Sequence, residues 1–335
     1  MDNRIKVIDY FRGFSIFTII VYHYLGTLKL PGLLTYAIGF GGTGVHVFIL
    51  ISGFGLYLSY LKKPLSYFAF LSKRFSKVYI PAIIAVTIIV LISFIVPIYK
   101  PSLYAYLGHV FLYKMFDNRI MCSYGIHFWF ISLIFQFYFL FPLIVKAKEK
   151  LSDSWFLGLG LFISLSWSVF VALIGKDDVR VWNGCFLQYL WEFSLGMYLA
   201  ERYLRQGFKF WEISNIKLIG ITIISLVLFA LLVFKFGKIG KLFDDVPALF
   251  SYAGVALLIF SYSPQFIKQF FYKTGDISYS LYLYHIVVLL LVAYFAPALG
   301  VLGLIISILL TYAVALLIEQ LTARKSKPIV AKVSA

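Results

Sequence analysis

The chain has 335 residues, of which 62% are hydrophobic and only 13% are charged, and its mean hydropathy is +0.92. Soluble domains carry nearer 25% charged residues, so this composition excludes a soluble globular protein. The formal net charge of +16 would suggest a nucleic-acid partner in a soluble chain. In a membrane protein the positive-inside bias accounts for it better, and no nucleic-acid-binding motif is present.

The first apolar stretch, residues 8–28, carries charges at its start and one histidine far along its length. In a helix, Arg12 and His23 fall within about 20° of the same face and are roughly 16 Å apart along the axis. A polar group in lipid is costly and therefore often functional, but His23 could instead only hydrogen-bond a neighbouring helix. Asp9, three residues before Arg12, is placed to orient that arginine.

Apolar segments of spanning length, about 20 residues each, follow one another along the whole chain. The ten segments are 8–28, 44–61, 78–98, 126–145, 155–174, 184–200, 214–234, 247–263, 277–295 and 300–320. With a cytoplasmic N-terminus, the inner connections receive 21 of the 30 lysines and arginines. This bias predicts an all-α, polytopic bundle of about ten transmembrane helices with both termini cytoplasmic. We expect residues 1–335 to form one transmembrane domain without a separate soluble domain.

Two basic residues lie between the second and third segments, where the assignment places the cytoplasmic side. Arg74 and Lys77 are three residues apart and therefore share a helix face. Such a pair suits an anionic phosphate ligand. It would also suit an anchor on anionic lipid headgroups, and the residues alone leave both readings open.

Polar side chains also occur inside later segments. Glu192 is an intramembrane carboxylate that should face the bundle interior, either pairing with another group or taking part in chemistry. Ser278, Tyr282 and His285 follow the spacing i, i+4, i+7 and form one polar stripe, which favours a lined cavity.

The remaining candidate ligand residues give weaker signals. We expect His46 and His127, near outer helix ends, to be interfacial. No cluster of histidine, cysteine and carboxylate has the sequence spacing of metal ligands, so no metal is predicted. Cys122 and Cys185 both fall on the predicted outer side, and whether they pair is open.

Five motifs in order resemble those of the acyltransferase 3 family of membrane acyltransferases, across about residues 5–320. They are Asp9-x-x-Arg12-Gly13 with His23; Gly44-Val45-His46-Val47-Phe48 with Ser52-Gly53-Phe54; Lys73-Arg74 with Lys77 and Pro81; His127-Phe128-Trp129 with Tyr138 and Pro142; and Ile277-Ser278-Tyr279 with Tyr282 and His285. Each motif alone is short and aromatic-rich, and the specificity comes from their order and spacing.

The chain departs from the family pattern at several positions. The second arginine of the Arg-x-x-Arg element is Lys77, which keeps the charge but loses the planar fork. His46 stands where many members have an acidic residue, and the Phe-Phe pair is Phe48-Ile49. The appended esterase-like domain of some members is absent from this sequence. These departures weaken any inference about the acyl group or the acceptor.

The resemblance implies an enzyme that moves an acyl group, often acetyl, from cytoplasmic acyl-CoA to a hydroxyl of a cell-surface or lipid-linked glycan. It implies that His23 is the catalytic residue, assisted by Asp9, and that Arg12, Arg74 and Lys77 hold the CoA phosphates. The residues expected to line the substrate cavity are Trp129, Glu192, Ser278, Tyr282 and His285. The resemblance also implies a multi-pass protein of a bacterial inner membrane or plasma membrane.

Other functions fit the same composition. A glycan or lipid transporter would use ten spans and buried histidines, although the paired helix breaks of inverted-repeat transporters are not visible. A non-catalytic component of a polysaccharide assembly complex would keep the motifs for packing. Binding of acyl-CoA separates the enzyme from both. His23 could act as a general base or as a nucleophile that carries the acyl group, and the sequence does not choose between them.

Overall fold

The computed structural model describes residues 5–207 and 213–325, and within these ranges the regular structure is entirely helical. The helices of the first half are α1 (Lys6–Leu25), α2 (Gly32–Gly41), α3 (Gly44–Lys62), α4 (Tyr67–Arg74), α5 (Ile80–Ile95), α6 (Leu103–Val110) and α7 (Trp129–Lys150). Those of the second half are α8 (Asp153–Leu173), α9 (Arg180–Asn183), α10 (Phe186–Gln206), α11 (Asn215–Phe243), α12 (Asp245–Tyr262), α13 (Gln265–Asp276), α14 (Ser278–Phe295) and α15 (Gly300–Lys325). A π-helical turn, Phe75–Tyr79, joins α4 to α5, and short 3₁₀ turns cover Tyr113–Phe116, Asn118–Ile120, Ile126–Phe128 and Pro297–Leu299.

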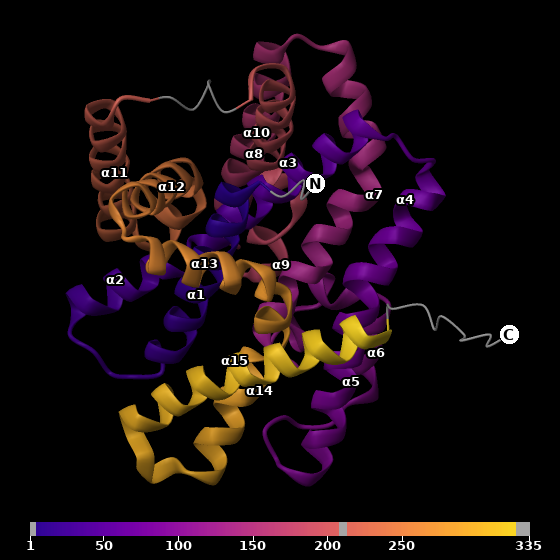
Figure 1. Ribbon diagram of the computed structural model, residues 1–335, viewed down its shortest axis with the longest axis vertical. Helices are drawn as coiled ribbons and strands as arrows, with labels where there is room; N and C mark the ends of the chain where they lie inside the picture. Colours follow the sequence, from indigo (N-terminus) through magenta and orange to yellow (C-terminus); the bar gives the residue numbers. More distant parts are fainter. Residues whose placement is uncertain (1–4, 208–212, 326–335) are drawn as a thin grey trace, which may run out of the picture.

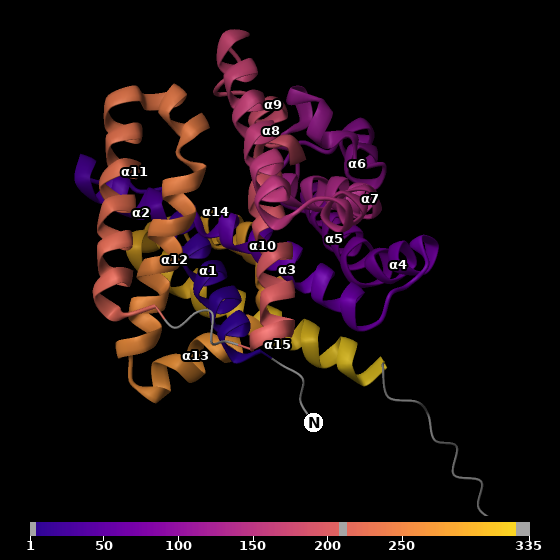
Figure 2. The ribbon, with the colours of Figure 1, turned by 90° about the horizontal axis from the view of Figure 1, so that it is seen from above.

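Each of the ten predicted segments falls on a helix, and the prediction of an all-α polytopic bundle is confirmed. Eight helical stretches of the described residues are long and apolar enough to cross a membrane. Neither α1 nor α10 is among the eight; both contain several charged residues. In Figure 2, α1 begins and α15 ends toward the same, lower side of the bundle. The number of spans and the membrane side of the termini stay predictions.

The bundle is built from pairs of helices that lie along one another. The main pairs are α3 with α10, α1 with α13, α11 with α12, α8 with α10 and α14 with α15 (Figure 1). A Cβ atom on Gly53 of α3 would lie 2.2 Å from the backbone oxygen of Phe193, and one on Gly196 of α10 would lie 2.0 Å from that of Leu50. The two backbones therefore touch, as small residues allow in membrane helix packing.

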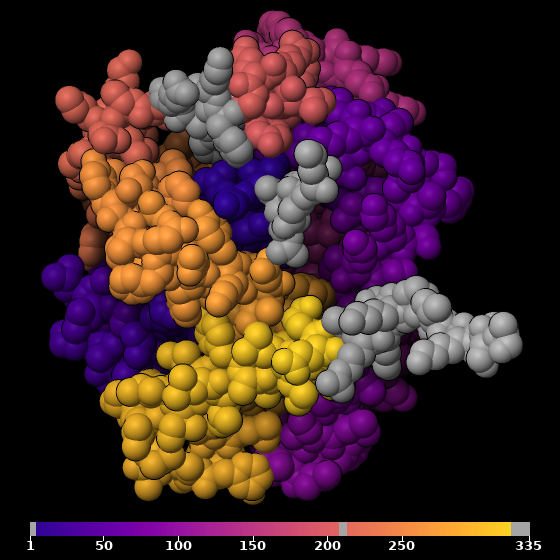
Figure 3. Space-filling view, viewed as in Figure 1, coloured from indigo at the N-terminus to yellow at the C-terminus, as the bar shows by residue number. Residues whose placement is uncertain are grey.

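Helix α13 was not foreseen as a separate element, because it lies in a connection predicted to be a cytoplasmic loop. It packs along α1 and also contacts α15 on the face shown in Figure 3. The hydroxyl oxygens of Thr274 in α13 and Tyr312 in α15 are 3.2 Å apart. Helix α1 is thus packed against α13, and α13 in turn contacts α15.

Two connections differ from the loops that the sequence suggested. The connection 235–245 is largely helical, since α11 continues to Phe243 across a kink at Gly237, where φ is +54°. The connection 99–125 folds around Lys114, whose ammonium group donates hydrogen bonds to the carbonyls of Ser123 (2.7 Å) and Gly125 (2.8 Å). Burial lowers the pKa of Lys114 to about 7. Cys122 and Cys185 are both free thiols.

Candidate active site

A cavity of about 1700 Å³ runs through the bundle and gathers predicted site residues from distant parts of the chain. Its lining includes seven of the predicted residues: Arg12, His23, Arg74, Lys77, Trp129, Ser278 and Tyr282. They come from α1, α4, the π-helical turn, α7 and α14. The helical periodicity that placed Arg12 and His23 on one face therefore describes one wall of a real cavity.

His23 lies at one end of a row of three imidazole rings. Its ring centroid is 5.2 Å from that of His285, which in turn is 4.7 Å from that of His127. His127 is only 3% exposed, so the expectation that it is interfacial is wrong. The sequence could not place it, because the approach depends on how the connection before α7 folds back toward α14.

Hydrogen bonds to the backbone hold this row in place. The hydroxyl of Tyr24, next to His23 in α1, donates to the carbonyl of His285 at 2.8 Å. The hydroxyl of Tyr282 donates to the carbonyl of His127 at 2.6 Å. Both tyrosines thus tie distant segments together, and Tyr282 also lines the cavity.

The hydrogen bonds of His285 also determine its tautomer. Its Nδ1 atom lies 2.8 Å from the carbonyl oxygen of Tyr282, which can only accept, so Nδ1 carries the proton. In a neutral ring the other nitrogen, Nε2, then carries a lone pair, and it has no hydrogen-bond partner among the described residues. His285 is 0% exposed and is not part of the cavity lining. His285 therefore contacts His23, which lines the cavity, but does not itself lie on the cavity surface, where the polar stripe predicted it.

The cationic residues lie where the cavity meets the π-helical turn. Arg74 is the last residue of α4, and its guanidinium carbon is 5.4 Å from the ring centroid of Phe70 and 5.9 Å from that of Tyr138. No carboxylate of the described residues forms an ion pair with Arg74 or Lys77, and Arg74 Nε has no hydrogen-bond partner there. A guanidinium that lies beside aromatic rings and has no carboxylate partner can donate several hydrogen bonds to one bound anion. Interruptions of α-helices by π-helical turns are often found at functional sites.

Asp9 lies near Arg12 and far from His23. Its carboxylate oxygen is 3.9 Å from a guanidinium nitrogen of Arg12, as expected from a spacing of three residues. Asp9 and His23 are fourteen positions apart in α1, about 21 Å along the axis, and Asp9 does not line the cavity. Its position fits orientation of Arg12 and does not allow direct assistance to His23.

A second region of the cavity was missed by the sequence analysis. The guanidinium carbon of Arg180 lies 4.8 Å from the ring centroid of Trp129. Tyr189 also contacts Trp129, and the lining further includes unpredicted aromatic and charged side chains: Tyr36, Asp177, Asp178, Phe234 and Lys238. These residues belong to α2, to the connection before α9 and to α10 and α11, and no local pattern relates them.

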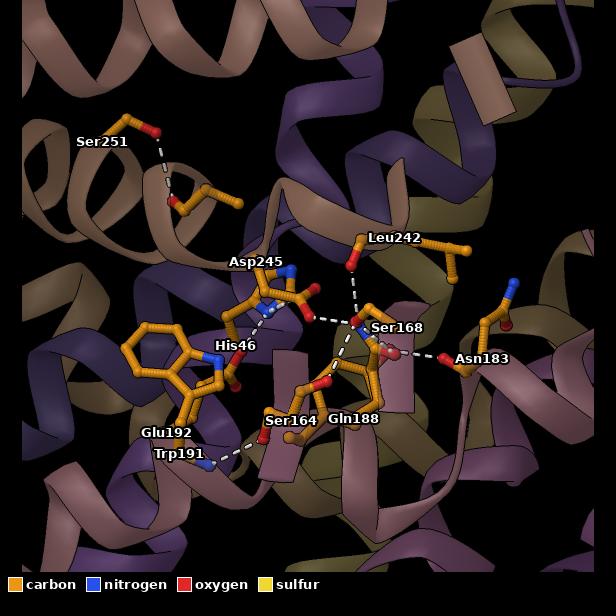
Figure 4. A network of polar contacts seen from close by, with 12 residues as sticks. His46, Ser164, Ser168, Asn183, Gln188, Trp191, Glu192, Leu242, Asp245 and Ser251 are labelled. Carbon is orange, nitrogen blue, oxygen red and sulfur yellow. Dashed lines mark hydrogen bonds and ion pairs between the residues drawn. The ribbon is translucent and has the colours of Figure 1, made fainter. Parts of the chain in front are cut away.

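Glu192 forms a buried cluster with His46 beside the cavity (Figure 4). His46 Nδ1 lies 2.7 Å from Glu192 Oε1 and 3.9 Å from Asp245 Oδ1. His46 is 7% exposed and Glu192 is 0% exposed, so the interfacial position expected for His46 is wrong. Glu192 does not line the cavity, although it was predicted to. The sequence spacing showed no set of metal ligands, but the fold brings together three residue types that bind metals.

Comparison with known proteins agrees with the arrangement of motifs. The acyltransferase 3 family model, described as an acyltransferase domain, matches residues 5–320. No curated protein and no solved structure matches the chain. The match spans nearly the whole sequence and includes every motif that contributes to the cavity. The chain is a multi-pass membrane protein, and it belongs to the acyltransferase 3 family.

Proposed function

We propose that this membrane acyltransferase moves an acyl group, in the first instance acetyl, from cytoplasmic acyl-CoA to a hydroxyl of a cell-surface or lipid-linked glycan. The observation that supports the proposal most is that His23 and the three cations Arg12, Arg74 and Lys77 line the same cavity. One continuous space thus holds groups suited to both the phosphate end and the thioester end of acyl-CoA.

The cationic end suits the donor. Coenzyme A carries several phosphate charges, and guanidinium groups bind phosphate through charge-assisted, often paired hydrogen bonds. Arg12 and His23 are separated by roughly 16 Å along α1, a distance that the extended pantetheine arm of acyl-CoA can span. With its phosphates at the cations, the thioester would reach the imidazole of His23.

His23 supports two routes for the transfer. As a general base, it accepts the proton of the acceptor hydroxyl while the hydroxyl oxygen attacks the thioester carbonyl. The C–S bond breaks, and the CoA thiolate leaves and takes up the proton. As a nucleophile, a ring nitrogen of His23 attacks first and forms an acyl-imidazole as the thiolate leaves. The thiolate takes up the proton of the other ring nitrogen. The acceptor hydroxyl then takes the acyl group, and its proton returns to the ring, which restores neutral His23.

The second region of the cavity suits the acceptor. Aromatic rings such as Trp129 and Tyr36 offer flat apolar faces to the C–H surfaces of a sugar, and Asp177, Asp178 and Arg180 offer hydrogen bonds to its hydroxyl groups. A cavity of this volume has room for a drug-sized ligand or larger. A glycan hydroxyl approaching from this region would meet the acyl group near His23.

Binding of acyl-CoA tests the proposal against transport and against a non-catalytic role. Purified protein in detergent should bind acetyl-CoA in calorimetry, and His23→Ala should bind it with little change, because His23 acts on the thioester and not on the phosphates. Mass spectrometry of surface glycans from cells with and without the protein should then show a mass difference of one acyl group per modified sugar. A folded protein that binds no acyl-CoA would contradict the proposal.

A further inference from the structure

The buried cluster beside the cavity joins three helices that are far apart in the sequence. His46 is the third residue of α3, Glu192 lies in the second turn of α10, and Asp245 is the first residue of α12. One nitrogen and two carboxylate oxygens, one from each residue, all lie within 4.8 Å of one another. Figure 4 shows the three side chains converging from their separate helices.

The cluster buries more negative charge than its own residues can neutralise. Glu192 is 0% exposed and Asp245 is 8% exposed, and the neighbouring Asp244 is also 8% exposed. Among the three clustered residues the one basic group is His46, which supplies at most one positive charge, while the neighbouring Asp244 interacts electrostatically with Lys241 as well as with His46. Buried carboxylates in proteins are normally paired or bound to metal. Glu192 Oε2 is buried and has no hydrogen-bond partner among the described residues. The cluster therefore lacks positive charge and has an oxygen lone pair to offer.

A hydrogen-bond chain on the other side fixes the orientation of Asp245. The side-chain amide of Gln188 donates to Asp245 Oδ2 at 2.5 Å and to the carbonyl of Leu242 at 3.0 Å. The hydroxyl of Ser168 donates to Gln188 Oε1 at 3.2 Å. Asp245 Oδ1 is thereby left to face His46. Outer hydrogen bonds of this kind typically orient the carboxylate ligands of metal ions.

The geometry is close to that of a three-ligand metal site. In a tetrahedral site with bonds of about 2.1 Å, ligand atoms lie about 3.4 Å apart. The separation of His46 from Asp245 is 3.9 Å, that of His46 from Glu192 is 2.7 Å, and all three ligand atoms lie within 4.8 Å of one another. Changes of at most about 1.4 Å in these separations would create the tetrahedral arrangement. His46 and Asp245 both line the cavity, which leaves a fourth position for water or a ligand.

We propose that His46, Glu192 and Asp245 bind one divalent cation, with zinc as the best match. One imidazole and two carboxylates, with an open fourth position, are a ligand set that Zn²⁺ accepts in proteins. The cation neutralises the buried carboxylates and links α3, α10 and α12 beside the cavity. This inference does not depend on the acyl donor or acceptor, because it rests only on the cluster.

Metal content tests the site directly. The full-length protein, loaded with Zn²⁺ in detergent and desalted, should retain about one equivalent of zinc per chain. His46→Ala and Glu192→Gln should each lose most of it. Asp178→Asn is the matched control, because this exposed carboxylate lines the same cavity but lies outside the cluster. Its zinc content should equal that of the unchanged protein.

Two further measurements separate loss of the site from loss of the fold. Increasing Zn²⁺ concentration should raise the melting temperature of the unchanged protein progressively, and not that of Glu192→Gln. Loading with Co²⁺ should give the visible absorption bands of a tetrahedral site, which His46→Ala should abolish. An unchanged protein that retains no zinc and melts at the same temperature with and without it would show that protons alone balance the cluster. Full zinc retention by folded Glu192→Gln would also overturn the proposal.

Discussion

Replacement of Arg74 by alanine tests how the cavity binds its donor. The guanidinium lies beside the rings of Phe70 and Tyr138 and has no carboxylate partner among the described residues. Its position is therefore set by packing, and its donors remain available for phosphate. A hydrogen bond to a charged group contributes about 1.5–3 kcal/mol, and each 1.4 kcal/mol is tenfold in affinity. We expect Arg74→Ala to raise the KM for acetyl-CoA about 10- to 100-fold, with a smaller change in kcat.

Lys73 provides the matched control for this prediction. It is adjacent in the sequence and exposed, but it does not line the cavity. If the basic residues only anchor the helix on lipid headgroups, Lys73→Ala and Arg74→Ala should have similar effects. If Arg74 binds the donor, only Arg74→Ala should change the KM, and Arg74→Lys should fall between the two, because it keeps the charge without the fork. Steady-state kinetics in proteoliposomes measures all three, and an unchanged KM in Arg74→Ala would refute the reasoning.

The remaining predictions concern the parts that hold the site together. A Cβ on Gly13 would lie 1.9 Å from the backbone oxygen of Phe271, so Gly13→Ala should destabilise the protein by about 1–3 kcal/mol through overpacking. Gly55→Ala should have no such effect in thermal melting, because a Cβ at Gly55 has no atom within 4 Å. Equal effects of the two substitutions would contradict the close contact between α1 and α13. Burial lowers the pKa of Lys114 from 10.5 to about 7. The unfolded chain therefore binds more protons than the folded one between these values, and stability should rise with pH across that window. Melting at pH 7 and pH 9 should show this rise in the unchanged protein and a smaller one in Lys114→Met, whereas an equal rise in both would exclude Lys114 as its source. Tyr24→Phe removes the hydrogen bond to His285 and should lower kcat more than it raises KM, and a pure KM effect would speak against a positioning role.

Local patterns in the sequence were enough for the ten long apolar helices and for one wall of the cavity, but not for α13. Arg12 and His23 share a face because helical periodicity depends only on their spacing. Arg74 and Lys77 likewise line the same cavity. The length of the apolar runs was enough to locate the ten segments. A long apolar run in lipid must satisfy its backbone polar groups by its own hydrogen bonds, and a helix does this.

Contacts between distant segments could not be predicted in this way. His127 meets His285 only because the connection before α7 folds back around Lys114. His46 and Glu192 belong to different helices, and their approach depends on the close packing of α3 against α10. Asp245 was assigned to a loop, because the predicted apolar segment ends at residue 234. The helix in fact continues past the kink at Gly237 as far as Phe243. Such contacts depend on how whole helices pack against one another, and local sequence patterns do not predict this packing.

Transfer of labelled acetyl from acetyl-CoA by the protein in liposomes tests the central role of His23 most directly. The unchanged protein should transfer the label to a glycan acceptor. His23→Ala should stop the transfer while it still binds acetyl-CoA and melts at a similar temperature. Label that stays on the unchanged protein in the absence of acceptor, and is lost in His23→Ala, would identify the acyl-imidazole route. Full transfer by folded His23→Ala would contradict the account, because the cavity would then carry out its chemistry without the histidine.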